Sequence, residues 1–151
     1  MSNKVLLKVE NLTKYFSTPK GQLHAVDGVS FEIEEGKTLG IVGESGCGKS
    51  TTGRTILKLI QPTSGRIIFD GKDITKYSPR QMRSLRKEMQ IIFQDPFSSL
   101  DPRQTVSQLI SEPIREHGVL KGKHEIHRRT IELMETVGLA ERYVNTYPHE
   151  L

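Results

Sequence analysis

The most constraining feature of this sequence is a short glycine-rich segment, Gly43–Ser50, with the sequence GESGCGKS. It fits the pattern G-x-x-x-x-G-K-[ST] at every fixed position. An apolar run, Thr38–Val42, precedes it, and Lys49–Ile60 follows with apolar residues at helical spacing. The order of buried strand, glycine loop and helix predicts an α/β fold. The alternative is a glycine-rich turn with an unrelated lysine, and the flanking strand and helix weigh against it.

The residue types of this loop suit a chain of anionic oxygens. Its three glycines are Gly43, Gly46 and Gly48. Without side chains the backbone can approach closely enough for several N–H groups to point at one anion. The helix that begins near Lys49 directs its free N–H groups and its dipole at the same place. The loop therefore predicts binding of the phosphates of ATP.

The last residues of the segment add charge and a metal ligand. Lys49 can reach the β- and γ-phosphates as a point charge, and the hydroxyl of Ser50 can ligate Mg²⁺. Thr51 is placed for a further phosphate contact. Cys47 occupies a variable position, where we expect only its backbone to matter. The alternative is a redox role, because helix N-termini lower thiol pKa values and oxidation there would block nucleotide.

Composition limits the classes of protein that remain. The chain has 151 residues, enough for a real core, and a formal net charge of +4 with both signs interleaved. This pattern favours an ordinary solvated surface over a nucleic-acid interface. No apolar run approaches the roughly 20 residues that a membrane-spanning helix needs. A single cysteine excludes an internal disulfide, so we expect a soluble protein of the cytoplasm.

Patterns outside the loop predict further elements. Strands are expected at Val5–Val9 and Ala25–Ile33, with a loop over residues 17–22. Asp70-Gly71 indicates a hairpin. Ser78-Pro79 marks a helix reaching about Lys87, and a second buried strand is expected at Met89–Phe93.

After Gln94 the pattern becomes helical. One helix carries Val106 and Ile114 on one face, and Pro113 should end or kink it. Another helix should close at Gly138. Prolines interrupt the pattern near residues 97–103, which predicts a division into a nucleotide-binding core, 1–96, and a partial helical subdomain, 97–151.

At this point the sequence resembles the nucleotide-binding subunits of ABC transporters. Gly43–Thr51 is similar to their Walker A motif in the form G-x-S-G-x-G-K-S-T, which includes Ser45. The segment around Gln94, IIFQDP, resembles their Q-loop. NLTKYF resembles the segment that holds the adenine-stacking aromatic, which matches Phe16, with Tyr15 as the close alternative.

The resemblance implies roles, cofactors and partners. Residues Phe16, Gly43, Ser45, Gly46, Cys47, Gly48, Lys49, Ser50 and Thr51 would contact the nucleotide. Lys49 and Gln94 would act in hydrolysis, and Ser50 and Gln94 would lie at the Mg²⁺. A permease would be contacted through the helical subdomain, and a second ATPase subunit would pair with the first. The protein would then lie on the inner face of the cell membrane.

A narrower match points to one branch of the family. QDPFSSLDPR, which begins at Gln94, is similar to the subunits that power uptake of dipeptides and oligopeptides. Glu112-Pro113 and the segment 147–151, YPHEL, agree with that branch. Nickel importers are similar enough to stay open. The sequence also leaves open a nucleotide-binding module without turnover and a soluble ABC-type protein of translation or DNA repair.

The resemblance also has a limit. In this family the signature motif begins at or just after the position of Leu151, and the Walker B aspartate, the catalytic glutamate and the switch histidine follow it. None of them is in this sequence. We therefore expect a P-loop NTPase fold of the ABC ATPase type, N-terminal part only. By itself it should be marginally stable and have little or no ATPase activity.

Two smaller patterns have simpler interpretations. His124 and His127 are three residues apart on an expected helix, where a solvated face is favoured over a metal site. Asp95 and Asp101 lie in a proline-rich loop, where a turn role is favoured over acid–base chemistry.

Overall fold

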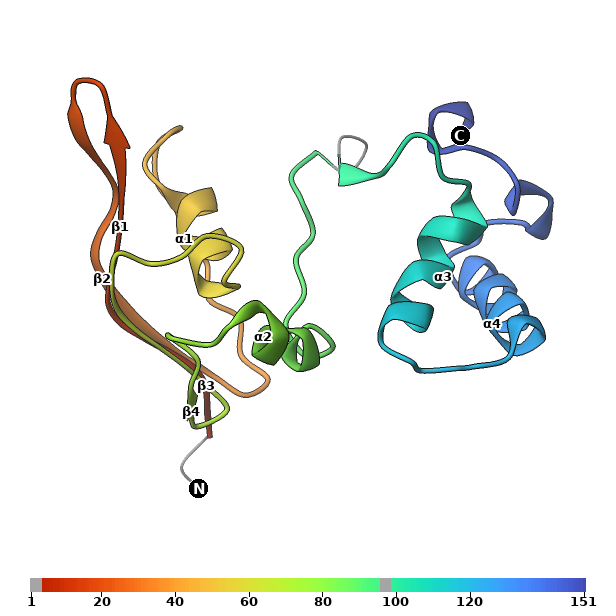
Figure 1. The fold of residues 1–151 in the computed structure, drawn as a ribbon, viewed down its shortest axis with the longest axis horizontal. Helices are drawn as coiled ribbons and strands as arrows, with labels where there is room; N and C mark the ends of the chain where they lie inside the picture. The colour runs from red at the N-terminus through yellow and green to blue at the C-terminus, as the bar shows by residue number, and fades with distance from the viewer. Residues whose placement is uncertain (1–3, 96–98) are drawn as a thin grey trace. The chain divides into compact units, whose positions relative to one another are not determined.

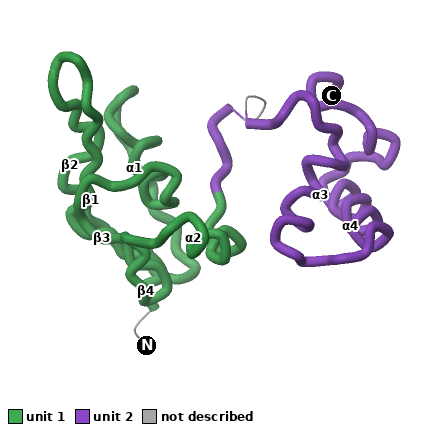
Figure 2. Tube along the Cα trace, in the orientation of Figure 1, with its two compact units in different colours: residues 1–90 green, residues 91–151 purple. Residues whose placement is uncertain are grey.

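The computed structural model describes residues 4–95 and 99–151 (Figure 1). The chain forms two compact units, residues 1–90 and residues 91–151 (Figure 2). The division into 1–96 and 97–151 expected from the sequence stays a prediction. None of the described helices is long and apolar enough to cross a bilayer.

The first unit is built on an antiparallel sheet. Strands β1 (Val5–Thr18) and β2 (Gly21–Glu34) form a long hairpin, and β3 (Ser64–Phe69) pairs with β1 on its other side. The short strand β4 (Lys72–Asp73) completes the order β2-β1-β3-β4. The two strands expected near the N-terminus are confirmed, and both extend well beyond the apolar runs that predicted them.

The hairpin between β3 and β4 is also confirmed. Asp70 and Gly71 both have positive φ, 47° and 74°. A two-residue hairpin turn needs this backbone conformation at both positions, and Asp-Gly adopts it readily.

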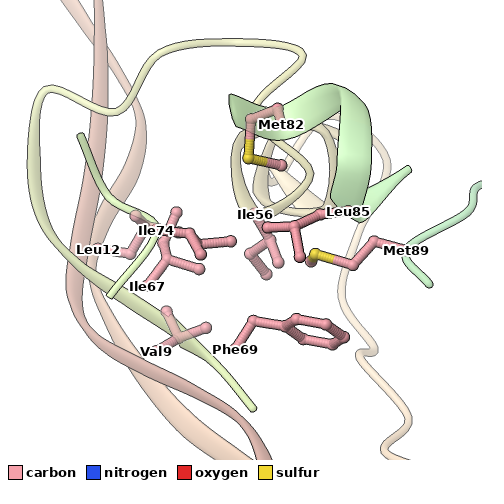
Figure 3. Close-up of a cluster of buried hydrophobic side chains, with 9 residues drawn as sticks. All are labelled: Val9, Leu12, Ile56, Ile67, Phe69, Ile74, Met82, Leu85 and Met89. Atoms are coloured by element: carbon pink, nitrogen blue, oxygen red, sulfur yellow. The ribbon is translucent and has the colours of Figure 1, made fainter. Parts of the chain in front are cut away.

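One face of the sheet is buried under two helices, α1 (Lys49–Ile56) and α2 (Pro79–Leu85). Nine side chains from these strands and helices and from adjoining turns meet there (Figure 3): Val9, Leu12, Ile56, Ile67, Phe69, Ile74, Met82, Leu85 and Met89. Burial of this apolar surface is the main force that fixes α1, and therefore its N-terminus, against the sheet.

Helix α1 ends one turn earlier than the sequence predicts, at Ile56 and not near Ile60. The cause lies at Lys58, whose φ of 55° is incompatible with a continuing helix. Its ammonium donates to Gln61 Oε1 at 2.6 Å and to the carbonyl of Thr75. Arg86 donates to the carbonyl of Leu57 at 2.7 Å. Side chains therefore satisfy the backbone at the end of α1 and attach it to the rest of the unit.

Helix α2 begins as the sequence predicts. Ser78 is its N-cap, with Pro79 in the first turn. Ser78 and Gln81 form a reciprocal capping box, in which each side chain accepts from the backbone N–H of the other residue. The helix ends at Leu85, close to the expected Lys87.

Two expected buried strands, Thr38–Val42 and Met89–Phe93, are not formed, so these predictions are wrong. Val42 is 93% exposed and Ile92 is 94% exposed. A buried strand needs hydrogen-bonded neighbours, and no strand of the described residues pairs with either segment. An apolar run alone therefore does not make a strand here.

The second unit is helical. Helix α3 (Val106–Glu116) begins with a capping box between Thr105 and Gln108. It continues past Pro113, so this proline does not end the helix, and the alternative of a kink stays a prediction. A proline removes one backbone donor, and the capped start together with the buried side chains Val106 and Ile114 outweighs that loss.

Helix α4 (Lys123–Thr136) packs against α3 and is followed by short 3₁₀ turns at Glu141–Tyr143 and Pro148–Glu150. Gly138 closes α4, as predicted. Its N–H donates to the carbonyl of Glu135 at 2.9 Å, and that of Leu139 donates to the carbonyl of Met134 at 2.9 Å. These two bonds form a Schellman motif around the positive φ of Gly138.

The approach of β3 to β1 gives a stability prediction. Gly65 has a φ of 95°, and a Cβ there would lie 2.5 Å from the carbonyl oxygen of Asn11. We expect Gly65→Ala to lower the free energy of unfolding by about 3–4 kcal/mol, from backbone strain and a clash with the neighbouring strand. Gly71→Ala has a similar φ of 74° and open space, so it should cost only about 1–2 kcal/mol. Urea unfolding followed by circular dichroism measures both, and equal losses would contradict the close approach.

Candidate functional site

The predicted phosphate loop joins the exposed segment 38–42 to the start of α1 in the first unit (Figure 1). Gly46 and Gly48 have φ values of 80° and 97°. Gly48 is the N-cap of α1, and its carbonyl accepts the first helical hydrogen bond, from Thr52 N–H at 2.8 Å. The predicted order of glycine loop and helix is therefore present, with the glycines at the bends.

The side chain of Lys49 folds back into this loop. Its ammonium donates to the carbonyl oxygens of Gly43 and Glu44, both at 2.7 Å. It also lies 3.5 Å from Cys47 Sγ. The loop thus closes around one positive charge, which is half-buried while most of the loop around it is exposed.

The N-terminus of α1 adds further donors. No side chain caps it among the described residues. The first backbone N–H groups of a helix have no partner within the helix, and they carry the positive end of its dipole. Ser50 is exposed beside them, and its hydroxyl makes no hydrogen bond within the described part of the chain. Cationic and N–H donors therefore converge on one exposed loop, which suits a phosphate chain.

Ser45 and Cys47 are exposed in the same loop. A Cβ on Gly43 would lie 2.6 Å from Cys47 Sγ, so the Cys47 sulfur lies against the Gly43 backbone. This contact gives the Cys47 side chain a packing role in addition to the expected role of its backbone. A redox role for the thiol stays a hypothesis.

The loop packs against strand β2 at Ala25, a residue that no sequence pattern indicated. A Cβ on Gly48 would lie 2.0 Å from the carbonyl oxygen of Ala25, so only glycine fits. Ala25 carries no functional group, and no motif draws attention to it. Its importance comes from the position of its backbone, which pattern analysis does not reveal.

Phe16 and Tyr15 lie near the end of β1, which pairs with this part of β2. Tyr15 pairs with His24 and Phe16 with Leu23. The ring of Tyr15 stacks on His24 with centroids 3.8 Å apart, and its hydroxyl donates to Asp27. The ammonium of Lys14 lies over the Phe16 ring, 4.8 Å from its centroid. Since neighbouring side chains of a strand point to opposite faces, only one of the two rings can face a given ligand.

The structure thus brings most of the predicted nucleotide contacts into one unit. Segment 43–51 and Phe16 all belong to residues 1–90. Gln94 belongs to the second unit, in an exposed stretch without regular structure. Its role in hydrolysis and at a metal ion stays a prediction, as does the choice of Phe16 over Tyr15.

The structure shows where the other polar residues singled out in the sequence lie. Asp101 Oδ1 accepts from the N–H of Arg103 at 3.0 Å, which is a turn role. Among the described residues, no group of three or more His, Cys, Asp and Glu side chains is arranged to hold a metal ion. His124 and His127 are both exposed on α4.

Comparisons with known proteins agree on one family. The family profile described as ABC transporter matches residues 26–151. The oligopeptide transport ATP-binding protein OppF of Bacillus subtilis (strain 168) is 47% identical over 146 residues, which cover 96% of this chain and 48% of OppF. The glutathione import ATP-binding protein GsiA of Escherichia coli (strain K12) is 47% identical over 152 residues, covering 96% of this chain and 24% of GsiA. The chain spans about half the length of the first relative and about a quarter of the second.

Solved structures share the fold. The ATP-binding cassette MJ0796, in a dimeric post-hydrolysis state bound to ADP and Pi, has a TM-score of 0.82 and 27% identity. That match covers 97% of this chain and 63% of the other. A second structure, cbiO1 from Clostridium perfringens, part of the ABC transporter complex cbiONQ, has a TM-score of 0.71 and 32% identity, covering 98% and 56%.

The contact between Gly48 and Ala25 generates a prediction for binding. Gly48→Ala should weaken ATP binding by at least about tenfold, because the new methyl must displace either the loop or β2. Gly36→Ala is the matched control, since Gly36 also has positive φ, 73°, but has open space and lies outside the loop. Titration with a fluorescent ATP analogue gives both affinities. Wild-type affinity in Gly48→Ala would show that this contact does not shape the loop.

Proposed function

This chain belongs to the ABC transporter family, and on that premise we propose that it forms the ATP-binding part of an importer for dipeptides and oligopeptides. The expected fold, α/β of the P-loop ABC ATPase type, is confirmed by its likeness to the solved cassettes. The observation that carries the proposal is the loop at the start of α1, where the Lys49 ammonium and the free helix N–H groups converge.

Lys49 is the residue on which nucleotide binding depends most. Its ammonium donates to two loop carbonyls in this structure. A phosphate oxygen is a stronger acceptor for an ammonium than a neutral carbonyl, because the bond then joins opposite charges. We infer that the side chain turns from these carbonyls to the β- and γ-phosphates, while the helix N–H groups hold the same oxygens.

Mg²⁺ fits the oxygen donors that this loop offers. Ser50 is exposed at the first turn of α1 with its hydroxyl unpaired among the described residues, and it would be one ligand. A role for Gln94 at the ion stays a prediction from the resemblance. A bound ion would supply positive charge beside the phosphates during transfer to water.

Turnover needs more than this loop supplies. Hydrolysis requires an oriented water and a metal held from more than one side. In this structure the Lys49 ammonium donates to two backbone carbonyls and lies 3.5 Å from the Cys47 sulfur. We propose that these 151 residues alone bind ATP with little or no hydrolysis, and that turnover belongs to the assembled transporter.

The proposed partners follow from the family and from the relatives' names. OppF and GsiA are named as transport and import ATP-binding proteins, and MJ0796 was solved as a dimer. We propose that this chain pairs with a second ATPase subunit and contacts permease subunits through residues 97–151, at the inner face of the membrane. These relatives weigh against a soluble ABC-type protein of translation or DNA repair. Nickel remains an alternative cargo.

The proposal predicts the behaviour of one substitution. Lys49→Ala should weaken ATP binding by at least about tenfold, because a charged donor to the phosphates is lost. In cells it should abolish uptake of a labelled dipeptide that depends on this protein. Lys37→Ala, at an exposed lysine outside the loop, is the control and should leave both unchanged.

Three results would overturn parts of this proposal. Wild-type ATP affinity in Lys49→Ala would remove the loop from nucleotide binding. Normal peptide uptake in cells carrying Lys49→Ala would refute the peptide cargo. ATP turnover by the 151 residues alone, abolished by Lys49→Ala, would refute the absence of hydrolysis in this part.

A further inference from the structure

Strand β2 contains an irregularity at the place where the phosphate loop touches it. Lys14 of β1 pairs with Val26, and the next residue, Tyr15, pairs with His24. Strand β2 therefore carries one extra residue, Ala25, between the two pairs. Such a bulge bends a strand and turns its backbone away from the regular ladder.

The extra residue is the one that meets the loop. The carbonyl oxygen of Ala25 lies where a side chain on Gly48 would begin, 2.0 Å from an ideal Cβ. Gly48 is the N-cap of α1 and precedes Lys49, so a shift of the bulge would shift the donors that the loop presents. The position of Ala25 is therefore coupled to the geometry of the phosphate site.

Three side chains enclose this bulge. His24 and Asp27 stand on either side of Ala25 along β2, and Tyr15 lies opposite them on β1. The Tyr15 ring stacks on His24 with centroids 3.8 Å apart, and the Tyr15 hydroxyl donates to Asp27 Oδ1. His24 Nδ1 lies 3.7 Å from Asp27 Oδ2, which closes the set. Tyr15 thus contacts both flanks of the extra residue.

We propose that Tyr15, His24 and Asp27 form a clasp that fixes the Ala25 bulge and so positions Gly48 and the phosphate loop for nucleotide. The inference rests on the proposed nucleotide binding. All three act through the backbone of β2 and are positioning residues. Phe16, on the opposite face of β1, is then left to contact the base.

The clasp adds little to the fold itself. His24 and Asp27 are exposed, Tyr15 is half-buried, and none of them belongs to the apolar core. Backbone pairing with β1 continues on both sides of the bulge, from Val5 to Thr18. The hydrogen bond to Asp27 raises the pKa of Tyr15, as expected for a phenol that donates to a carboxylate. The contacts among Tyr15, His24 and Asp27 are therefore better explained by control of the Ala25 bulge than by a contribution to the stability of the fold.

The alternative is that Tyr15 itself stacks on the base. Its stacking on His24 and the fixed direction of its hydroxyl weigh against this. The two roles predict effects on the binding of different ligands. A residue that positions the loop affects any triphosphate, whereas a residue that stacks on adenine affects only ligands with a base.

The test compares two ligands, Mg-ATP and Mg-tripolyphosphate, with the protein as it is naturally expressed. Tyr15→Phe removes one hydroxyl and keeps the ring. We expect it to raise the Kd of both ligands by the same factor, about threefold to tenfold, the size of one ordinary net hydrogen bond. Phe16→Ala should raise the Kd of Mg-ATP and leave that of Mg-tripolyphosphate unchanged.

Matched variants separate positioning from loss of structure. Asp27→Asn keeps an acceptor oxygen for Tyr15 and should bind within about twofold of wild type, whereas Asp27→Leu should behave as Tyr15→Phe. Tyr143→Phe removes a hydroxyl that accepts from Arg142 at 3.1 Å in the second unit and should change nothing. Calorimetric titration gives the affinity of the folded fraction, and thermal unfolding gives its stability.

Other outcomes would contradict either the clasp or the proposed nucleotide site. Unchanged affinities in Tyr15→Phe, or a lower melting temperature alone, would overturn the clasp. An effect of Tyr15→Phe on Mg-ATP only would assign Tyr15 to the base and overturn it as well. If Lys49→Ala also binds both ligands normally, the proposed nucleotide site fails. If Lys49→Ala loses them while Tyr15→Phe does not, only the clasp fails.

Discussion

The contact between the N-cap of α1 and the backbone of β2 fixes the position of the phosphate loop, where nucleotide binding is proposed. Gly48 lies against the carbonyl of Ala25 so closely that no side chain fits between them. At its other end, α1 is fixed by Ile56 in the core and by Arg86, which bonds the carbonyl of Leu57. A helix fixed at both ends directs its free N–H groups in one constant direction, and a phosphate site requires donors placed before the ligand arrives.

The loop is held by hydrogen bonds between one charged side chain and backbone carbonyls. Two carbonyls, of Gly43 and Glu44, accept from the Lys49 ammonium, so an exposed chain with little regular structure closes around one cation. The same bonds keep the lysine at the place where an anion would bind. In the proposed function, exchange of these neutral acceptors for phosphate oxygens would supply the gain in binding energy.

Apolar segments in this chain show how much strand formation depends on neighbours. Val5–Val9 and Ala25–Ile33 lie within paired strands, because β1 is held by β2 on one side and β3 on the other. Thr38–Val42 and Met89–Phe93 have equally apolar sequences and no pairing strand among the described residues. Val42 and Ile92 are consequently among the most exposed large apolar side chains. The composition of a segment sets its affinity for a sheet, and the presence of a partner decides whether it joins one.

The sequence by itself determined the loop and helix at Gly43–Ser50, the Asp70-Gly71 hairpin, the start of α2 at Ser78, and the close of α4 at Gly138. Each depends on residues adjacent in the chain, such as a cap, a turn pair or a glycine with positive φ. Only the tertiary structure decided that α1 ends at Ile56, that α3 continues past Pro113, and that Ala25 supports the phosphate loop. Those outcomes depend on backbone positions and on partners distant in sequence, including Lys58 with Thr75 and Gly48 with Ala25. No local pattern encodes such contacts, because they arise only when separate segments pack together.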